Sequence, residues 1–130
     1  MQILLPPGWP RPRGYSNGVS VRGQLVFVAG MVGWDTTGRF PSDTLAGQAR
    51  TALENIVAVL HEAGAKPEHI VRMTWYVLDK AAYRAAAAEL GVAFREIIGS
   101  YNATMSAVEV SALMEDAALV EIEVTAVIPD

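Results

Sequence analysis

The stretch VEIEVTA near the end of the chain constrains the fold most, because its polarity alternates strictly. Successive side chains of a β-strand point to opposite faces of a sheet, so one face of this strand is purely apolar. That face carries Val120, Ile122, Val124 and Ala126, which we expect to pack against helices. The opposite face carries Glu121, Glu123 and Thr125. The sequence therefore predicts a sheet with helices on one face and carboxylates on the other.

The remaining patterns predict one α+β domain over residues 1–130. Two strand-like runs, 19–21 and 25–29, are joined by Arg22, Gly23 and Gln24, a composition typical of a tight turn. This pattern predicts a hairpin. Apolar residues recur at helical spacing between an N-cap at Ser42 or Asp43 and a stop at Gly64. A strand is expected at 69–79, followed by one helix that Asp79 caps and that runs to residue 97. A hairpin beginning near residue 105 closes the chain.

The alternation in the two strands of this closing hairpin predicts which side chains share a face. Val108 and Val110 match the helix side, which would place Met105, Ala107 and Glu109 beside the glutamates. If this face of the sheet were open to solvent, it would be an ordinary polar surface. However, 52% hydrophobic and only 18% charged residues favour an oligomer, in which a second subunit covers the face. Covered carboxylates need donors, cations or a raised pKa, so the covered face would be a candidate site for chemistry.

Composition excludes several classes of function. The net charge is −4, and the ten basic residues are scattered, which argues against a nucleic-acid partner. No apolar run is long enough to span a membrane, and prolines interrupt the N-terminal stretch, so we expect a cytoplasmic protein. Cysteine is absent, and His61 and His69 lack a third ligand at metal spacing, so no metal site is expected. Ser106 has no nucleophile context, and Trp34, Trp75 and Tyr76 are interpreted as packing residues.

Five stretches of the chain, in order, resemble the motifs of one known family. GYSNGV is similar to the N-terminal family motif G-P-Y-S-x-G-V, and LVFVAGMVGWDTTG to L-V-F-x-S-G-Q-x-x-x-D-x-x-T-G. QARTALENIVAVLHEAGA resembles the first family helix, and IVRMTWYVLD the middle strand that ends in aspartate. SAVEVSALMEDAALVEIEVTAV resembles the C-terminal signature. By these five stretches the chain resembles the RidA (YjgF/YER057c) family, and the resemblance covers nearly the whole chain.

The resemblance implies a chorismate-mutase-like fold, a mixed sheet with two helices on one face, which assembles as a homotrimer with a small-molecule cleft at each subunit interface. In the deaminating branch of the family, water adds to an enamine or imine such as 2-aminoacrylate and ammonia leaves, without a cofactor. By position, Glu121 would activate the water, Tyr15 would line the cleft and Gly30 would contribute backbone. The substrate-binding set is completed by Ala29, Met105 and Ala107.

The departures from the motifs concern polar positions of the family. Met105 stands where the family has the arginine that clamps the substrate carboxylate, and Ala107 where a cysteine is common. Ala29 replaces a serine, and Ala87 an asparagine of the second helix. A thioether cannot replace an ion pair, so a compact 2-imino acid is not expected to be the preferred substrate. Methionine packs on aromatic or extended apolar ligands, which leaves a larger, flatter enamine open as the substrate. Arg11 or Arg13 could bind a carboxylate from the rim.

Three functions remain open from the sequence. The first is an enamine or imine deaminase with altered specificity. The second is a trimer that binds a small metabolite without turnover. The third is a ribonuclease or translation inhibitor, which the acidic charge disfavours.

Overall fold

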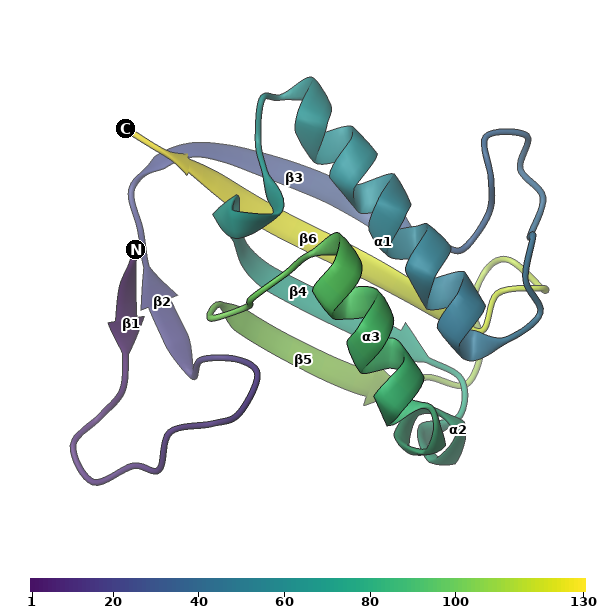
Figure 1. Ribbon diagram of the computed structural model, residues 1–130, viewed down its shortest axis with the longest axis horizontal. Coiled ribbons are helices and arrows are strands. Elements are labelled where there is room, and N and C mark those ends of the chain that lie inside the picture. The colour runs from purple at the N-terminus through teal and green to yellow at the C-terminus, as the bar shows by residue number, and fades with distance from the viewer.

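The computed structural model describes residues 1–130, and its main sheet carries helices on one face (Figure 1). The elements in chain order are β1 (Gln2–Leu4), β2 (Gly18–Ser20), β3 (Gly23–Met31), α1 (Leu45–Glu62), η1 (Pro67–His69), β4 (Ile70–Val77), α2 (Lys80–Ala85), α3 (Ala87–Ile97), β5 (Thr104–Glu109) and β6 (Val120–Pro129). The main sheet has the order β3-β6-β4-β5, and β1 and β2 form a separate two-stranded sheet. The predicted α+β class with a mixed sheet is confirmed. None of the helices combines the length and the apolar character that a membrane crossing requires.

Both predicted hairpins are wrong. β2 pairs with β1 instead of β3, and β3 pairs antiparallel with β6, with Val28 opposite Val124. β5 does not pair with β6 but lies parallel to β4, because α2 and α3 form the crossover that parallel neighbours need. β6 instead lies between β3 and β4. Turn composition indicates that the chain reverses, but it does not identify the partner of each strand.

The predicted faces of β5 are also wrong. Met105 is the register partner of the fully buried Met73, and it packs against the core on the helix side of the sheet. Val108 is the partner of Tyr76, which itself lies opposite Glu121, so Val108 shares the glutamate face. β5 is an edge strand with mostly exposed side chains, and for such a strand apolar residues do not identify the buried face. Ala107 and Glu109, like Met105, are therefore not on the face of Glu121.

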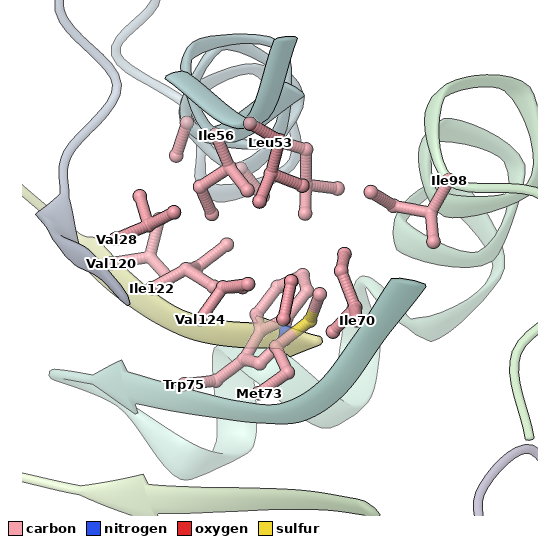
Figure 2. Close-up of a cluster of buried hydrophobic side chains, with 14 of the residues drawn as sticks. Val28, Leu53, Ile56, Ile70, Met73, Trp75, Ile98, Val120, Ile122 and Val124 are labelled. Atoms are coloured by element: carbon pink, nitrogen blue, oxygen red, sulfur yellow. The ribbon is translucent and has the colours of Figure 1, made fainter. Parts of the chain in front are cut away.

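The core lies between the sheet and α1, as the alternation in β6 predicted. Figure 2 shows Val120, Ile122 and Val124 of β6 directed towards Leu53 and Ile56 of α1. The same cluster includes Met73 and Trp75 of β4. Burying each large aliphatic side chain stabilises the fold by about 1.5–3 kcal/mol.

Side-chain caps begin α1 and α2, and a glycine follows the end of α1. Thr44 caps α1, one residue beyond the predicted Asp43, and its hydroxyl accepts a hydrogen bond from the Gly47 N–H at 3.1 Å. Gly64 has a φ of +74°, a left-handed conformation that suits glycine just beyond a helix. The Asp79 carboxylate accepts from the Ala82 N–H at 3.1 Å, which confirms the predicted cap. The predicted single helix is divided at Ala86 into α2 and α3, and nothing in the alanine run explains the break.

Gln48 of α1 is buried and joins the helix to the loop before β6. Its Oε1 accepts a hydrogen bond from the Leu119 N–H at 2.7 Å, and its Nε2 donates to the Ala117 carbonyl at 2.9 Å. Nε2 also donates to the Ser42 carbonyl at 3.2 Å. The side chain thus satisfies backbone groups of two loops, which fixes the point at which β6 begins.

Candidate functional site

The predicted site residues form two groups on opposite faces of the sheet. Tyr15, Met105 and Ala107 line a cleft on the helix side. Gly30 and Glu121 meet on the other face, where a β-carbon on residue 30 would overlap the Glu121 carboxylate. Ala29 is exposed beside Gly30 in the irregular end of β3. Within one chain, Met105 and Glu121 therefore do not share a site.

The cleft has a volume of about 830 Å³ and lies between the N-terminal segment, β4, β5 and the α2–α3 pair. Its sixteen lining residues are Arg13, Gly14, Tyr15, Trp75, Tyr83, Arg84, Ala87, Leu90, Gly91, Phe94, Arg95, Gly99, Ser100, Tyr101, Met105 and Ala107. Three of the four residues predicted to replace polar family residues are in this set, namely Ala87, Met105 and Ala107. The structure thus brings these three residues together at one cleft, from α3 and β5.

Aromatic rings in mutual contact make up much of the cleft wall. The Trp75 and Tyr83 ring centroids are 6.0 Å apart, those of Trp75 and Phe94 6.5 Å, and those of Phe94 and Tyr101 5.5 Å. Trp75 is only 3% exposed, and its Nε1–H has no hydrogen-bond partner. Its predicted packing role is confirmed, but the core leaves this donor unsatisfied.

Hydrogen bonds at the start of β5 hold the N-terminal segment against the cleft. The Ser16 N–H donates to the Ala103 carbonyl at 2.8 Å, and the Ser16 hydroxyl donates to the Asn102 carbonyl. This attachment places Tyr15 at the cleft. The Tyr101 hydroxyl donates to the Thr104 carbonyl at 2.7 Å, and burial raises the pKa of Tyr101 and of Tyr83, so both phenols are neutral at physiological pH.

Three arginines line the cleft, and the sequence predicted only one of them. Arg13 was expected at the rim and lies there, whereas Arg11 is not a lining residue. Arg84 and Arg95 come from α2 and α3 and were missed. The available signal was the helical spacing of Ala87, Gly91 and Arg95, which places all three on one helix face.

Only one of the three carboxylates expected to lie together makes no hydrogen bond. Glu109 accepts a hydrogen bond from the Lys80 N–H at 2.8 Å. Glu123 accepts one from the Tyr76 hydroxyl at 2.6 Å, and this bond raises the pKa of Tyr76. Glu121 is half-buried and makes no hydrogen bond or ion pair within the chain. Glu121 is therefore the carboxylate available for a ligand or a water molecule.

Known proteins resemble this chain over most of its length. Residues 10–128 match the family described as Endoribonuclease L-PSP. A RutC family protein of Pyrococcus abyssi is 35% identical over 127 residues, which cover 96% of this chain and 95% of that protein. The 2-iminobutanoate/2-iminopropanoate deaminase of Escherichia coli is 35% identical over 117 residues, with coverage of 87% and 84%.

A solved structure agrees with these sequence relationships. E. coli TdcF with bound serine superimposes with a TM-score of 0.70 at 31% identity, covering 98% of each chain. The identity and coverage of these relatives, together with the shared fold, establish the relationship that the five sequence motifs indicated. The chain belongs to the RidA/YjgF family, also described as RutC and Endoribonuclease L-PSP.

Proposed function

We propose that the protein is an enamine or imine deaminase whose specificity differs from that of relatives acting on small 2-imino acids. The E. coli relative named 2-iminobutanoate/2-iminopropanoate deaminase supports the reaction class. The observation that carries the proposal is Glu121, because its carboxylate is half-buried and unpaired against the backbone of Gly30. An unpaired carboxylate can accept a proton from water, as a general base must.

The proposed reaction is a hydrolysis that needs no oxidant or cofactor. Water adds its oxygen to the carbon of the C=N bond while Glu121 accepts one of its protons. The nitrogen then takes up protons, including the one held by Glu121, and the C–N bond breaks as the carbonyl forms. The products are a ketone or keto acid and ammonia. An enamine enters the same sequence after tautomerising to the imine.

The opposite faces of the two residue groups lead us to propose an active site shared between copies of the chain. In the homotrimer implied by the family resemblance, the cleft of one copy would face Glu121 and Gly30 of the next. The exposed Phe27 of β3 on the uncovered sheet supports this arrangement, since 72% of that side chain is accessible in the single chain.

Met105 is proposed to occupy the position of the family arginine and to change which substrates bind. The aliphatic thioether contributes packing but no charge. A small 2-imino acid depends on its carboxylate for orientation, so losing a bidentate arginine would weaken its binding. We therefore expect 2-aminoacrylate to be a poor substrate.

The test is ammonia release, first from 2-aminoacrylate generated by a dehydratase and then from larger enamines, with spontaneous hydrolysis subtracted. Native activity above background that disappears in Glu121→Gln would support the proposal. Met105→Arg should increase activity on 2-aminoacrylate at least tenfold. If Glu121→Gln retains native activity on every substrate, Glu121 is not the base and the proposal fails.

A second experiment tests the shared site. Glu121→Gln lacks the proposed base, and Ala87→Trp should fill the cleft from the exposed start of α3. If the site is shared, co-expression of these two inactive variants should restore part of the activity, because some interfaces combine an intact cleft with an intact Glu121. Absence of activity in mixed oligomers would contradict a shared site.

Metabolite binding without turnover is the second candidate, favoured by the apolar residues Ala87, Met105 and Ala107 in the cleft. A ligand that binds at the cleft without releasing ammonia would favour it over hydrolysis. The family name also suggests RNA cleavage, but a chain of net charge −4 offers little general attraction to phosphates. Salt-dependent RNA binding followed by RNA cleavage would make ribonuclease activity the stronger candidate.

A further inference from the structure

The cleft is lined by positive charges although the protein is acidic. Arg13, Arg84 and Arg95 contribute guanidinium groups, and no aspartate or glutamate is among the lining residues. The two ion pairs of the chain involve Arg22 and Arg50, so none of the three cleft arginines is paired with a carboxylate. Uncompensated cations in a concave surface concentrate anions. The charge distribution indicates an anionic ligand.

Arg95 is the cleft cation whose position along the wall is defined by a close approach to a glycine. On α3 it lies one turn after Gly91, and a β-carbon at residue 91 would be 3.2 Å from an Arg95 Nη1. The guanidinium thus lies against the helix where glycine leaves room for it. Glycine within a helix costs about 0.5–1 kcal/mol relative to alanine, so this arrangement weakens α3 locally.

The rest of the wall suits a flat apolar group. Phe94 precedes Arg95 and stands edge-on to Tyr101, and Met105 lies on the strand opposite. Aromatic edges and faces bind a further ring well, and methionine sulfur also packs favourably against rings. A volume of about 830 Å³ falls within the roughly 300–1,000 Å³ typical of clefts for drug-sized ligands. 2-Iminopropanoate would fill only a small part of it.

We infer that the cleft takes 2-imino acids with an aromatic side chain and binds their carboxylate with Arg95 of α3. The ring lies against Phe94 and Met105. The positive charge thus comes from residue 95 and an apolar contact from residue 105, whereas an arginine at position 105 would supply the charge from β5. This substrate class rests on the proposed function. Hydrolysis converts the aromatic imino acid and water to the aromatic keto acid and ammonia. The reaction that supplies such an imine is the two-electron oxidation of an aromatic amino acid.

Binding is tested without turnover, with phenylpyruvate as a stable mimic of the aromatic imino acid and pyruvate as the small comparator. Calorimetry should show phenylpyruvate binding at least tenfold more tightly than pyruvate. Arg95→Gln should weaken phenylpyruvate binding about 10- to 100-fold, the usual effect of losing a charged hydrogen bond. Gly91→Ala, which crowds the guanidinium, should weaken it less.

Arg22→Gln is the matched control, because Arg22 is an exposed arginine that does not line this cleft. It should leave phenylpyruvate binding unchanged, and Arg95→Gln should keep the native thermal midpoint because Arg95 is exposed. Equal affinity for pyruvate and phenylpyruvate would overturn the inference. So would phenylpyruvate binding that Arg95→Gln leaves intact.

Turnover separates this inference from the proposed function. Ammonia release is measured with the imine that an amino acid oxidase generates from phenylalanine. Tight, Arg95-dependent phenylpyruvate binding without ammonia release would support the ligand class and overturn the hydrolase. Glu121-dependent release from 2-aminoacrylate without phenylpyruvate binding would support the hydrolase and overturn the ligand class.

Discussion

Gly30 and Glu121 are in direct contact across β3 and β6, and the Glu121 carboxylate occupies the space that a side chain at residue 30 would need. Gly30→Ala should therefore destabilise the fold by about 1–3 kcal/mol, the usual cost of overpacking. Glu121→Ala removes a carboxylate without hydrogen bonds, so alone it should change the free energy of unfolding by less than about 0.5 kcal/mol.

The double variant Gly30→Ala/Glu121→Ala is the internal control for this prediction. It should recover most of the stability lost in Gly30→Ala, because the overlapping group is gone. Urea unfolding of all four proteins at one protein concentration measures the coupling, since assembly makes apparent stability depend on concentration. Strictly additive effects would show that the two residues do not compete for space.

Gln48→Met should destabilise the protein by about 3 kcal/mol, because it leaves buried backbone groups of two loops without partners. Gln24→Met makes the same chemical change at an exposed position of β3 and should have little effect. Hydrogen exchange adds a local readout, since the Leu119 N–H should exchange faster in Gln48→Met. Unchanged exchange there would mean that Gln48 does not protect this amide.

Ile56→Ala should cost about 2–5 kcal/mol, because Ile56 is completely buried between α1 and the sheet. Val59→Ala, at a position of the same helix that is 38% exposed, should change stability by less than about 0.5 kcal/mol. Thermal unfolding of both variants checks the orientation of α1. Similar losses in the two variants would contradict the observed buried face.

Tyr76 should titrate above its ordinary pKa of 10.0, because its hydroxyl donates to the Glu123 carboxylate. A raised pKa in the folded state favours the protonated phenol. Its contribution to stability is therefore present below pH 10.0 and is lost as the pH rises through the folded-state pKa. Glu123→Gln should move the pKa of Tyr76 back down, which NMR of the labelled tyrosine ring can follow. An unchanged pKa in that variant would show that Glu123 is not the cause.

The alternation around Glu121 predicted the buried face of β6 because a central strand under helices must separate apolar from polar side chains. The same reasoning failed for Met105, since the edge strand β5 has little burial to impose a pattern. Arg95 was missed because the cleft arises where α3, β5 and the N-terminal segment meet, and helical spacing alone does not show which surface faces a helix. Tyr15, Met105 and Ala107, which the family motifs single out, line one cleft, but Glu121 and Gly30 of the same chain do not.

The central position of β6 in the sheet also affects synthesis of the protein. β6 follows every other strand in the chain, yet it is the partner of both β3 and β4. Until its residues leave the ribosome, β3 has no neighbour in the main sheet and the apolar face of α1 has no complete surface to cover. We therefore expect this fold to form after translation of β6, with the nascent chain relying on chaperones to shield α1 beforehand.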